Sequence, residues 1–376
     1  MSESDATPRE DRPREEPAPK VEPMPRLLGE LLRAHGPSGY ETAPAAVWRA
    51  AAESFATVST DVVGTPIARV PAHHGARTPA RRAIVVGHID EIGLIVTHID
   101  DEGYLWFAPV GGWDAQILVG QRVTLTARVG ETPGVIGKKP IHLLRDEERK
   151  KVAEVRDLHI DVGAKDGEEA RKLVRVGDVA VIAGDPLELP NGRVASRALD
   201  NRLGSFVALE VARLVAEAGG AQWEVIAVAA TQEEITFGGS RTSAFSLDPE
   251  AAIVVDVTHA TDAPGIEVKE SGKHELGSGP VLSRGSTINP RLFELLHEAG
   301  EREEIAFTVE ASARSTGTDA DAVHLSRGGV ATAVVSIPLR YMHSPVELVE
   351  LGDVHACAKL IAAALLALDE DASLAR

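Results

Sequence analysis

The sequence predicts an α/β fold with a mostly parallel central sheet, helices on both faces of that sheet, and an inserted small β-barrel domain. Apolar runs of strand length alternate with amphipathic helical patterns in the first and last parts of the chain, as expected for a parallel sheet covered by helices. Between residues 98 and 189, short β-rich segments alternate instead with Gly, Pro and Asp turns. We therefore expect an α/β domain of residues 23–97 and 190–376, interrupted by a β domain at residues 98–189.

Each element of the α/β domain has its own local signal. Helices are expected where apolar residues recur on one face, at residues 27–35, 41–56, 200–214, 290–300 and 353–368. Asn289 followed by Pro290 is a strong helix start signal. Strands around a turn at Gly64 are expected at residues 58–70. Buried strands are expected at residues 83–87, 225–228, 251–255 and 331–337, which are rich in Val, Ile and Ala.

Composition narrows the class of protein. The net charge of −18, from 39 basic and 57 acidic residues, argues against a nucleic-acid or anionic-membrane partner. No apolar run approaches the ~20 residues of a membrane helix, and the N-terminus lacks the apolar core of a signal peptide, so we expect a cytoplasmic protein. Residues 1–22 mix Pro, Glu, Asp and Arg, which predicts a disordered tail. The single cysteine, Cys357, leaves no disulfide framework or cysteine-based zinc site.

Several predicted core strands end in histidine or acidic side chains, and in such sheets ligands gather at the C-terminal strand ends. These residues are His88, Asp90, Glu233, Glu234, Asp256 and His343, and Asp200 stands at a predicted helix start. So many carboxylates together are unfavourable without cations, and two divalent ions would neutralise them. Mixed imidazole and carboxylate donors suit zinc, cobalt or manganese better than calcium.

Glu233 and Glu234 are adjacent and follow a predicted strand directly. Because neighbouring residues on an extended chain point in opposite directions, we expect the two acids to take different roles. In a two-metal hydrolase one acid must stay uncoordinated to take a proton from water.

Six segments carry a resemblance to a known family. They are GHIDEIG (residues 87–93), SRALDNRLG (196–204), TQEE (231–234), VVDVTHATD (254–262), GTDAD (317–321) and IPLRYMHSPVE (337–347). In this order they resemble the TET / glutamyl aminopeptidases, dinuclear metallo-aminopeptidases of metallopeptidase family forty-two, some members of which were once labelled endoglucanases. The resemblance runs over residues 27–368 and implies a zinc-peptidase-like catalytic domain.

The resemblance assigns roles residue by residue. It implies that two divalent ions, zinc first with cobalt or manganese as alternatives, are bound by His88, Asp200, Glu234, Asp256 and His343. Asp200 would bridge the ions, with Glu234 and His343 on one and His88 and Asp256 on the other. Glu233 would be the general base acting on a metal-bridging water, and Asp90 would hold the imidazole of His88. The inserted domain would help to pack subunits of a homo-oligomer, in many members a dodecamer.

These implications favour an aminopeptidase that trims N-terminal residues from short peptides. A deacylase or another amide hydrolase could use the same site, and a non-catalytic assembly protein could keep the metals for stability. Glycoside hydrolysis by two carboxylates would leave His88 and His343 unexplained. Where the family often reads EEVGLRGA, this chain reads EEITFGGS (residues 233–240), so the preferred N-terminal residue does not carry over. Arg340 could contact a substrate carboxylate or pair with an acidic side chain.

Overall fold

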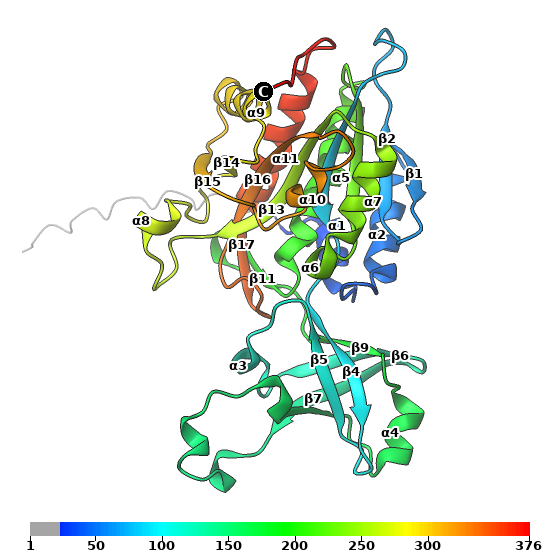
Figure 1. Ribbon diagram of the computed structural model, residues 1–376, viewed down its shortest axis with the longest axis vertical. Helices are drawn as coiled ribbons and strands as arrows, with labels where there is room; N and C mark the ends of the chain where they lie inside the picture. Colours follow the sequence, from blue (N-terminus) through cyan, green and yellow to red (C-terminus); the bar gives the residue numbers. More distant parts are fainter. Residues whose placement is uncertain (1–22) are drawn as a thin grey trace, which may run out of the picture.

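The computed structural model describes residues 23–376, and the predicted tail at residues 1–22 lies outside the described residues. Two parts are evident in Figure 1: an α/β part that holds both ends of the described chain, and a separate β barrel beneath it. Each part has its own cluster of buried apolar side chains. The predicted α/β fold with an inserted barrel is confirmed.

The α/β part is built on one sheet of eight strands. Their order is β1 (Thr57–Thr60), β2 (Pro66–Val70), β12 (Glu224–Ala230), β3 (Arg82–His88), β13 (Ala251–His259), β16 (Ala331–Leu339), β14 (Val281–Gly285) and β15 (Thr308–Ser312). The four central strands, β12, β3, β13 and β16, run parallel to one another. At the edges, β2 and β14 each join this core in the antiparallel sense. The C-terminal ends of the four central strands therefore meet at one edge.

Helices cover both faces of this sheet. On one side α5 (Leu199–Glu217) packs on β3, β12 and β13 and contacts α11 (Leu351–Leu366), while on the other α7 (Gly238–Leu247) and α10 (Ala320–Val323) contact each other and the sheet. The remaining helices of this part are α1 (Arg26–Arg33), α2 (Thr42–Ala52), α6 (Glu233–Thr236), α8 (Val268–Ser271) and α9 (Pro290–Arg302). Asn289 caps α9 as predicted, because its side chain accepts hydrogen bonds from the backbone of Arg291 and Leu292.

The barrel closes from six strands in the order β4 (Gly93–Ile99), β5 (Leu105–Val110), β8 (Leu158–Asp161), β7 (Gly130–Lys138), β6 (Arg122–Ala127) and β9 (Val179–Ile182). It also carries α3 (Ala115–Leu118), α4 (Gly167–Leu173) and three short 3-10 turns between residues 141 and 157. The first barrel strand starts five residues before the expected boundary at residue 98. A small sheet of β10 (Leu187–Leu189), β11 (Arg193–Ser196) and β17 (Glu347–Glu350) returns the chain to the α/β part.

Two glycines bring α5 unusually close to the sheet. A Cβ added to Gly87 in β3 would lie 2.1 Å from the carbonyl carbon of Gly204 in α5, and one added to Gly204 would lie 2.5 Å from the carbonyl oxygen of Val255 in β13. Only glycine fits at so close an approach. The approach sets the start of α5 beside the ends of β3 and β13. In the described range, no helix is both long enough and apolar enough to cross a membrane.

Candidate metal and active site

A cavity of about 320 Å³ opens at the C-terminal ends of the central strands. Six of the seven predicted site residues line it: His88, Asp200, Glu233, Glu234, Asp256 and His343. The seventh, Asp90, is fully buried and contacts His88 from behind. Topology explains this convergence, because parallel strands end at the same edge of the sheet.

His88 and Asp200 meet where the end of β3 faces the start of α5. The Nε2 atom of His88 lies 3.2 Å from Oδ1 of Asp200, and Nδ1 lies 3.3 Å from Oδ1 of Asp90. The imidazole is thus held on one side by a fully buried carboxylate while its other nitrogen faces the cavity, the usual support of a metal-binding histidine.

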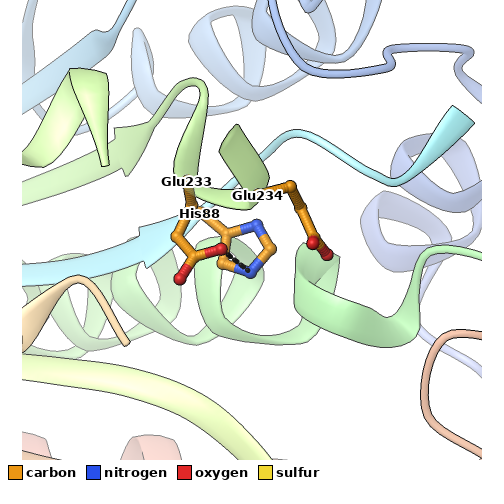
Figure 2. Close-up of side chains that lie close together, drawn as sticks. All are labelled: His88, Glu233 and Glu234. Atoms are coloured by element: carbon orange, nitrogen blue, oxygen red, sulfur yellow. Dashed lines mark ion pairs between the residues drawn. The ribbon is translucent and has the colours of Figure 1, made fainter. Parts of the chain in front are cut away.

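Glu233 and Glu234 lie in a helical turn, α6, and the expectation of an extended chain at this point is wrong. Gln232, with φ of 60°, adopts the left-handed conformation between β12 and the turn. The backbone N–H groups of Glu233 and Glu234 then donate to the two oxygens of Asp90, at 3.1 and 3.2 Å. Figure 2 shows the two glutamates on either side of the imidazole of His88, with Oε2 of Glu233 3.7 Å from Nε2. Asp90 therefore positions both His88 and this turn.

His343 is oriented by the barrel. Its Nδ1–H donates to the carbonyl oxygen of Gly112, 2.9 Å away in the segment that follows β5. Because a carbonyl only accepts, this bond places a proton on Nδ1 and leaves Nε2 as the nitrogen that faces the site and could bind a metal. Nε2 lies 3.4 Å from Oδ2 of Asp200 and 3.3 Å from Oε1 of Glu234. The inserted domain thus contributes a backbone atom to the site.

The donor atoms form groups that suit divalent metals. Two groups share Asp200, which joins His88 and Asp256 in one and Glu234 and His343 in the other, with all donor atoms of a group within 4.8 Å of one another. A third such group combines His88 with Glu233 and Glu234. Each group mixes imidazole with carboxylate, a donor set typical of zinc, cobalt and manganese. The residues present therefore fit divalent cations.

The electrostatics agree with this chemistry. Burial raises the pKa of Glu233 to about 10, and Asp256 adds to the shift while His88 opposes it. Burial also raises the pKa of Asp256 well above its usual range. Hydrogen bonds to two carboxylates raise the pKa of His343 to about 11. The cluster holds more carboxylates than its imidazoles can neutralise, which favours a cationic ligand.

Residues 69–360 match the model of the M42 glutamyl aminopeptidase family. The chain belongs to this family. It is 36% identical, over 90% of its own length and 96% of the relative's, to the lysyl aminopeptidase of Pyrococcus furiosus. Among solved structures it resembles the TET aminopeptidase of a marine-sediment thaumarchaeon, with a TM-score of 0.86, 35% identity and coverage of 91% and 96% of the two chains.

A second solved structure, the TET1 peptidase of Pyrococcus horikoshii, is described as able to assemble into a tetrahedron or a large octahedral shell. It has a TM-score of 0.76 and 30% identity, covering 91% of this chain and 99% of that one. The resemblance inferred from the six sequence segments is confirmed. The M42 chain is a peptide hydrolase, and a non-catalytic assembly protein is set aside.

Sequence reasoning missed one important side chain of this M42 site. Glu347 in β17 is buried, and its two oxygens accept the backbone N–H groups of Asp200 and His343, both at 3.0 Å. One carboxylate thus ties together two of the predicted metal ligands. Burial raises its pKa well above the usual range, and the two N–H donors oppose that shift. Glu347 lies within the IPLRYMHSPVE segment, but nothing in the pattern shows which backbone groups it meets.

Two further buried carboxylates support the turn and the strand ends. Glu41 accepts the backbone N–H of Gln232 at 2.9 Å and so helps to hold the left-handed residue before α6. Glu91 forms ion pairs with Arg197 and Arg202, which in turn donate to the backbone carbonyls at the end of α1. Both acids belong to the scaffold behind the site.

Arg340 is paired in the structure. Its Nε lies 3.1 Å from Oδ1 of Asp262, and a second guanidinium nitrogen contacts the other carboxylate oxygen. Such a two-point pair satisfies both groups. Of the two roles expected for Arg340, pairing with an acidic side chain is the one observed.

Proposed function

We propose that this M42 peptidase is a dinuclear-metal aminopeptidase that releases N-terminal residues from short peptides, with Glu233 as general base. The observation that carries the proposal is the arrangement of donors around Asp200. The two donor groups that share Asp200 use His88, Asp256, Glu234 and His343, whereas Glu233 occurs only in the third group, which lacks Asp200. Glu233 nevertheless lines the same cavity. An acid beside a metal site but outside its ligand set is what the reaction requires.

In the proposed site, His88, Asp200 and Asp256 would hold one ion, and Asp200, Glu234 and His343 the other. When bound, two divalent ions polarise the scissile carbonyl and acidify a water molecule. Zinc is the first choice, with cobalt or manganese as alternatives, because all three accept mixed nitrogen and oxygen donors.

The protein's own residues then manage one proton. Glu233 takes a proton from the attacking water while the oxygen of that water adds to the scissile carbonyl carbon. Glu233 then gives that proton to the amine nitrogen as the C–N bond breaks, so the acid ends the cycle unchanged. Asp90 holds His88 and the backbone of Glu233 in fixed relative positions, because it contacts Nδ1 of His88 and accepts the N–H of Glu233. The carbonyl of Gly112 keeps Nε2 of His343 directed into the site.

We also propose a homo-oligomer in which the barrel, expected at residues 98–189, takes part in subunit packing. Support comes from the Pyrococcus horikoshii relative, which assembles into large shells. Exposed apolar side chains in the segment between β7 and β8, such as Ile141 and Leu143, give the barrel a surface suited to such packing. We also propose that the protein is located in the cytoplasm.

The function is tested by hydrolysis of aminoacyl-p-nitroanilides, short peptides and N-acylated amino acids. Metal-free protein is compared with protein restored with Zn²⁺, Co²⁺ or Mn²⁺, and with two variants. Glu233→Gln is expected to bind both metals and lose turnover by about 10²-fold or more. Glu294→Gln, a change at an exposed position of α9, serves as the matched control and is expected to behave as wild type. Cleavage of N-acylated amino acids with no cleavage of free-amine substrates would instead indicate a deacylase.

A further inference from the structure

A second cavity adjoins the proposed active site. It has a volume of about 210 Å³ and shares four wall residues with the site cavity: Val257, Thr258, Thr316 and Thr318. A substrate whose scissile bond lies among the predicted metal ligands therefore has a neighbouring space that can receive a side chain.

The strand register shows where the second cavity leads. Asp256 pairs with Ser336 in the neighbouring strand β16, and Ser336 pairs with Val281 in β14. Ser283, two residues further along β14, pairs with Glu310 in β15. Because paired residues and residues two apart point to the same face of a sheet, all of these side chains lie on one face. The cavity thus runs over that face from the site towards the edge strand.

Glu310 gives this cavity its charge. Of the described residues that line it, Glu310 is the one with a charged side chain. Its carboxylate accepts hydrogen bonds from the hydroxyls of Ser283 at 2.6 Å and Thr258 at 3.2 Å. The other lining residues are Ser, Thr, Val and Ala. Within residues 23–376, no ion pair joins Glu310 to a basic side chain. Two hydroxyls therefore hold this half-buried carboxylate in place, and no basic side chain balances its charge.

We propose that this cavity receives the side chain of the substrate's N-terminal residue and that Glu310 selects a cationic one, lysine or arginine. The inference rests on the proposed aminopeptidase function. An ammonium or guanidinium group offers only donors, which complements a carboxylate that is held by two hydroxyls but lacks a cation. An acidic side chain would face Glu310 across a cavity with no basic group among its described lining residues. The net charge of −18 also favours approach of cationic peptides.

The test compares kcat/KM for lysyl-, arginyl-, leucyl- and glutamyl-p-nitroanilide in wild type, Glu310→Gln and the control Glu294→Gln. Wild type and the control are expected to prefer the lysyl and arginyl substrates. Glu310→Gln should lose about 10- to 100-fold on these two and change by less than about twofold on the leucyl substrate, because one charge-assisted contact is removed. Retained leucyl turnover shows that the variant is folded. Equal turnover of lysyl and leucyl substrates by wild type, or unchanged selectivity in Glu310→Gln, would overturn the inference.

A binding measurement separates this inference from the function on which it rests. Lysinamide and leucinamide are titrated by calorimetry into the metal-loaded wild type and Glu310→Gln. Tighter binding of lysinamide that depends on Glu310, without hydrolysis of any aminoacyl substrate, would contradict the proposed function while supporting the cation-selective cavity. Equal affinity for the two amides would refute the cavity's selectivity whatever the enzyme cleaves.

Discussion

Replacing Glu347 by glutamine tests whether one buried carboxylate holds two metal ligands in place. Glu347 is 2% exposed, and each of its oxygens accepts one backbone N–H, from Asp200 and from His343. In Glu347→Gln one oxygen becomes an NH₂ group, so one of these N–H groups must face a donor. An unsatisfied buried donor costs about 1–3 kcal/mol. We expect metal affinity to fall by about 10- to 100-fold, as is usual for groups that orient metal ligands.

The assay is a competition titration of metal-free protein with Zn²⁺ against a chelator of known affinity. Glu350→Gln is the matched control, since Glu350 belongs to the same strand but is about one-quarter exposed, at 26%, and pairs with Arg193 at 3.4 Å. Such surface pairs contribute about 0–1 kcal/mol, so the control should bind metal as wild type does. A folded Glu347→Gln protein with wild-type affinity at both metal sites would refute the reasoning.

Three further predictions follow from the scaffold. Gly87→Ala should push α5 away from β3 and lower the melting temperature, which corresponds to a loss of about 1–3 kcal/mol or more of stability. A Cβ added to Gly352 in helix α11 meets nothing within 4 Å. Gly352→Ala should therefore leave the melting temperature unchanged or raise it. Burial, aided by Asp90, raises the pKa of Glu41 from 4.5 to about 7, so the folded state holds this proton more tightly and stability falls as pH rises across that interval. Glu41→Gln removes this titration. As the pH rises from 4.5 to 7, the melting temperature of the variant relative to that of wild type should therefore increase, by the equivalent of at most about 3 kcal/mol of stability. A constant difference between the melting temperatures of Glu41→Gln and wild type across these pH values would contradict the raised pKa of Glu41. Cys357 is fully buried and its pKa is raised by burial, so a thiol reagent should label it only after unfolding, and rapid labelling of native protein would show that the helix opens.

The convergence of the candidate site could be predicted from the sequence because it follows from topology. Buried apolar runs predict parallel strands, and parallel strands bring their C-terminal parts to one edge. His88 ends β3, Asp256 lies near the end of β13, and Glu234 follows β12 in α6, and all three line the cavity there. Glycines in the segments around His88 and Asp200 mark the close contact of β3 with α5.

Other parts of the site depend on contacts that local patterns do not encode. The bond from His343 to Gly112 joins residues 231 positions apart and depends on how the barrel is set against the sheet. The two bonds of Glu347 likewise depend on the return of β17 to the site. The strand pattern before Glu233 gave no signal for the left-handed Gln232, so the helical turn that follows it was missed.

Anomalous X-ray diffraction from crystals grown with zinc, recorded at the zinc absorption edge, tests the central claim most directly. We expect two peaks per chain, one among His88, Asp200 and Asp256 and the other among Asp200, Glu234 and His343, with Glu233 unligated. A single peak, peaks elsewhere in the molecule, or direct coordination of zinc by Glu233 would contradict it.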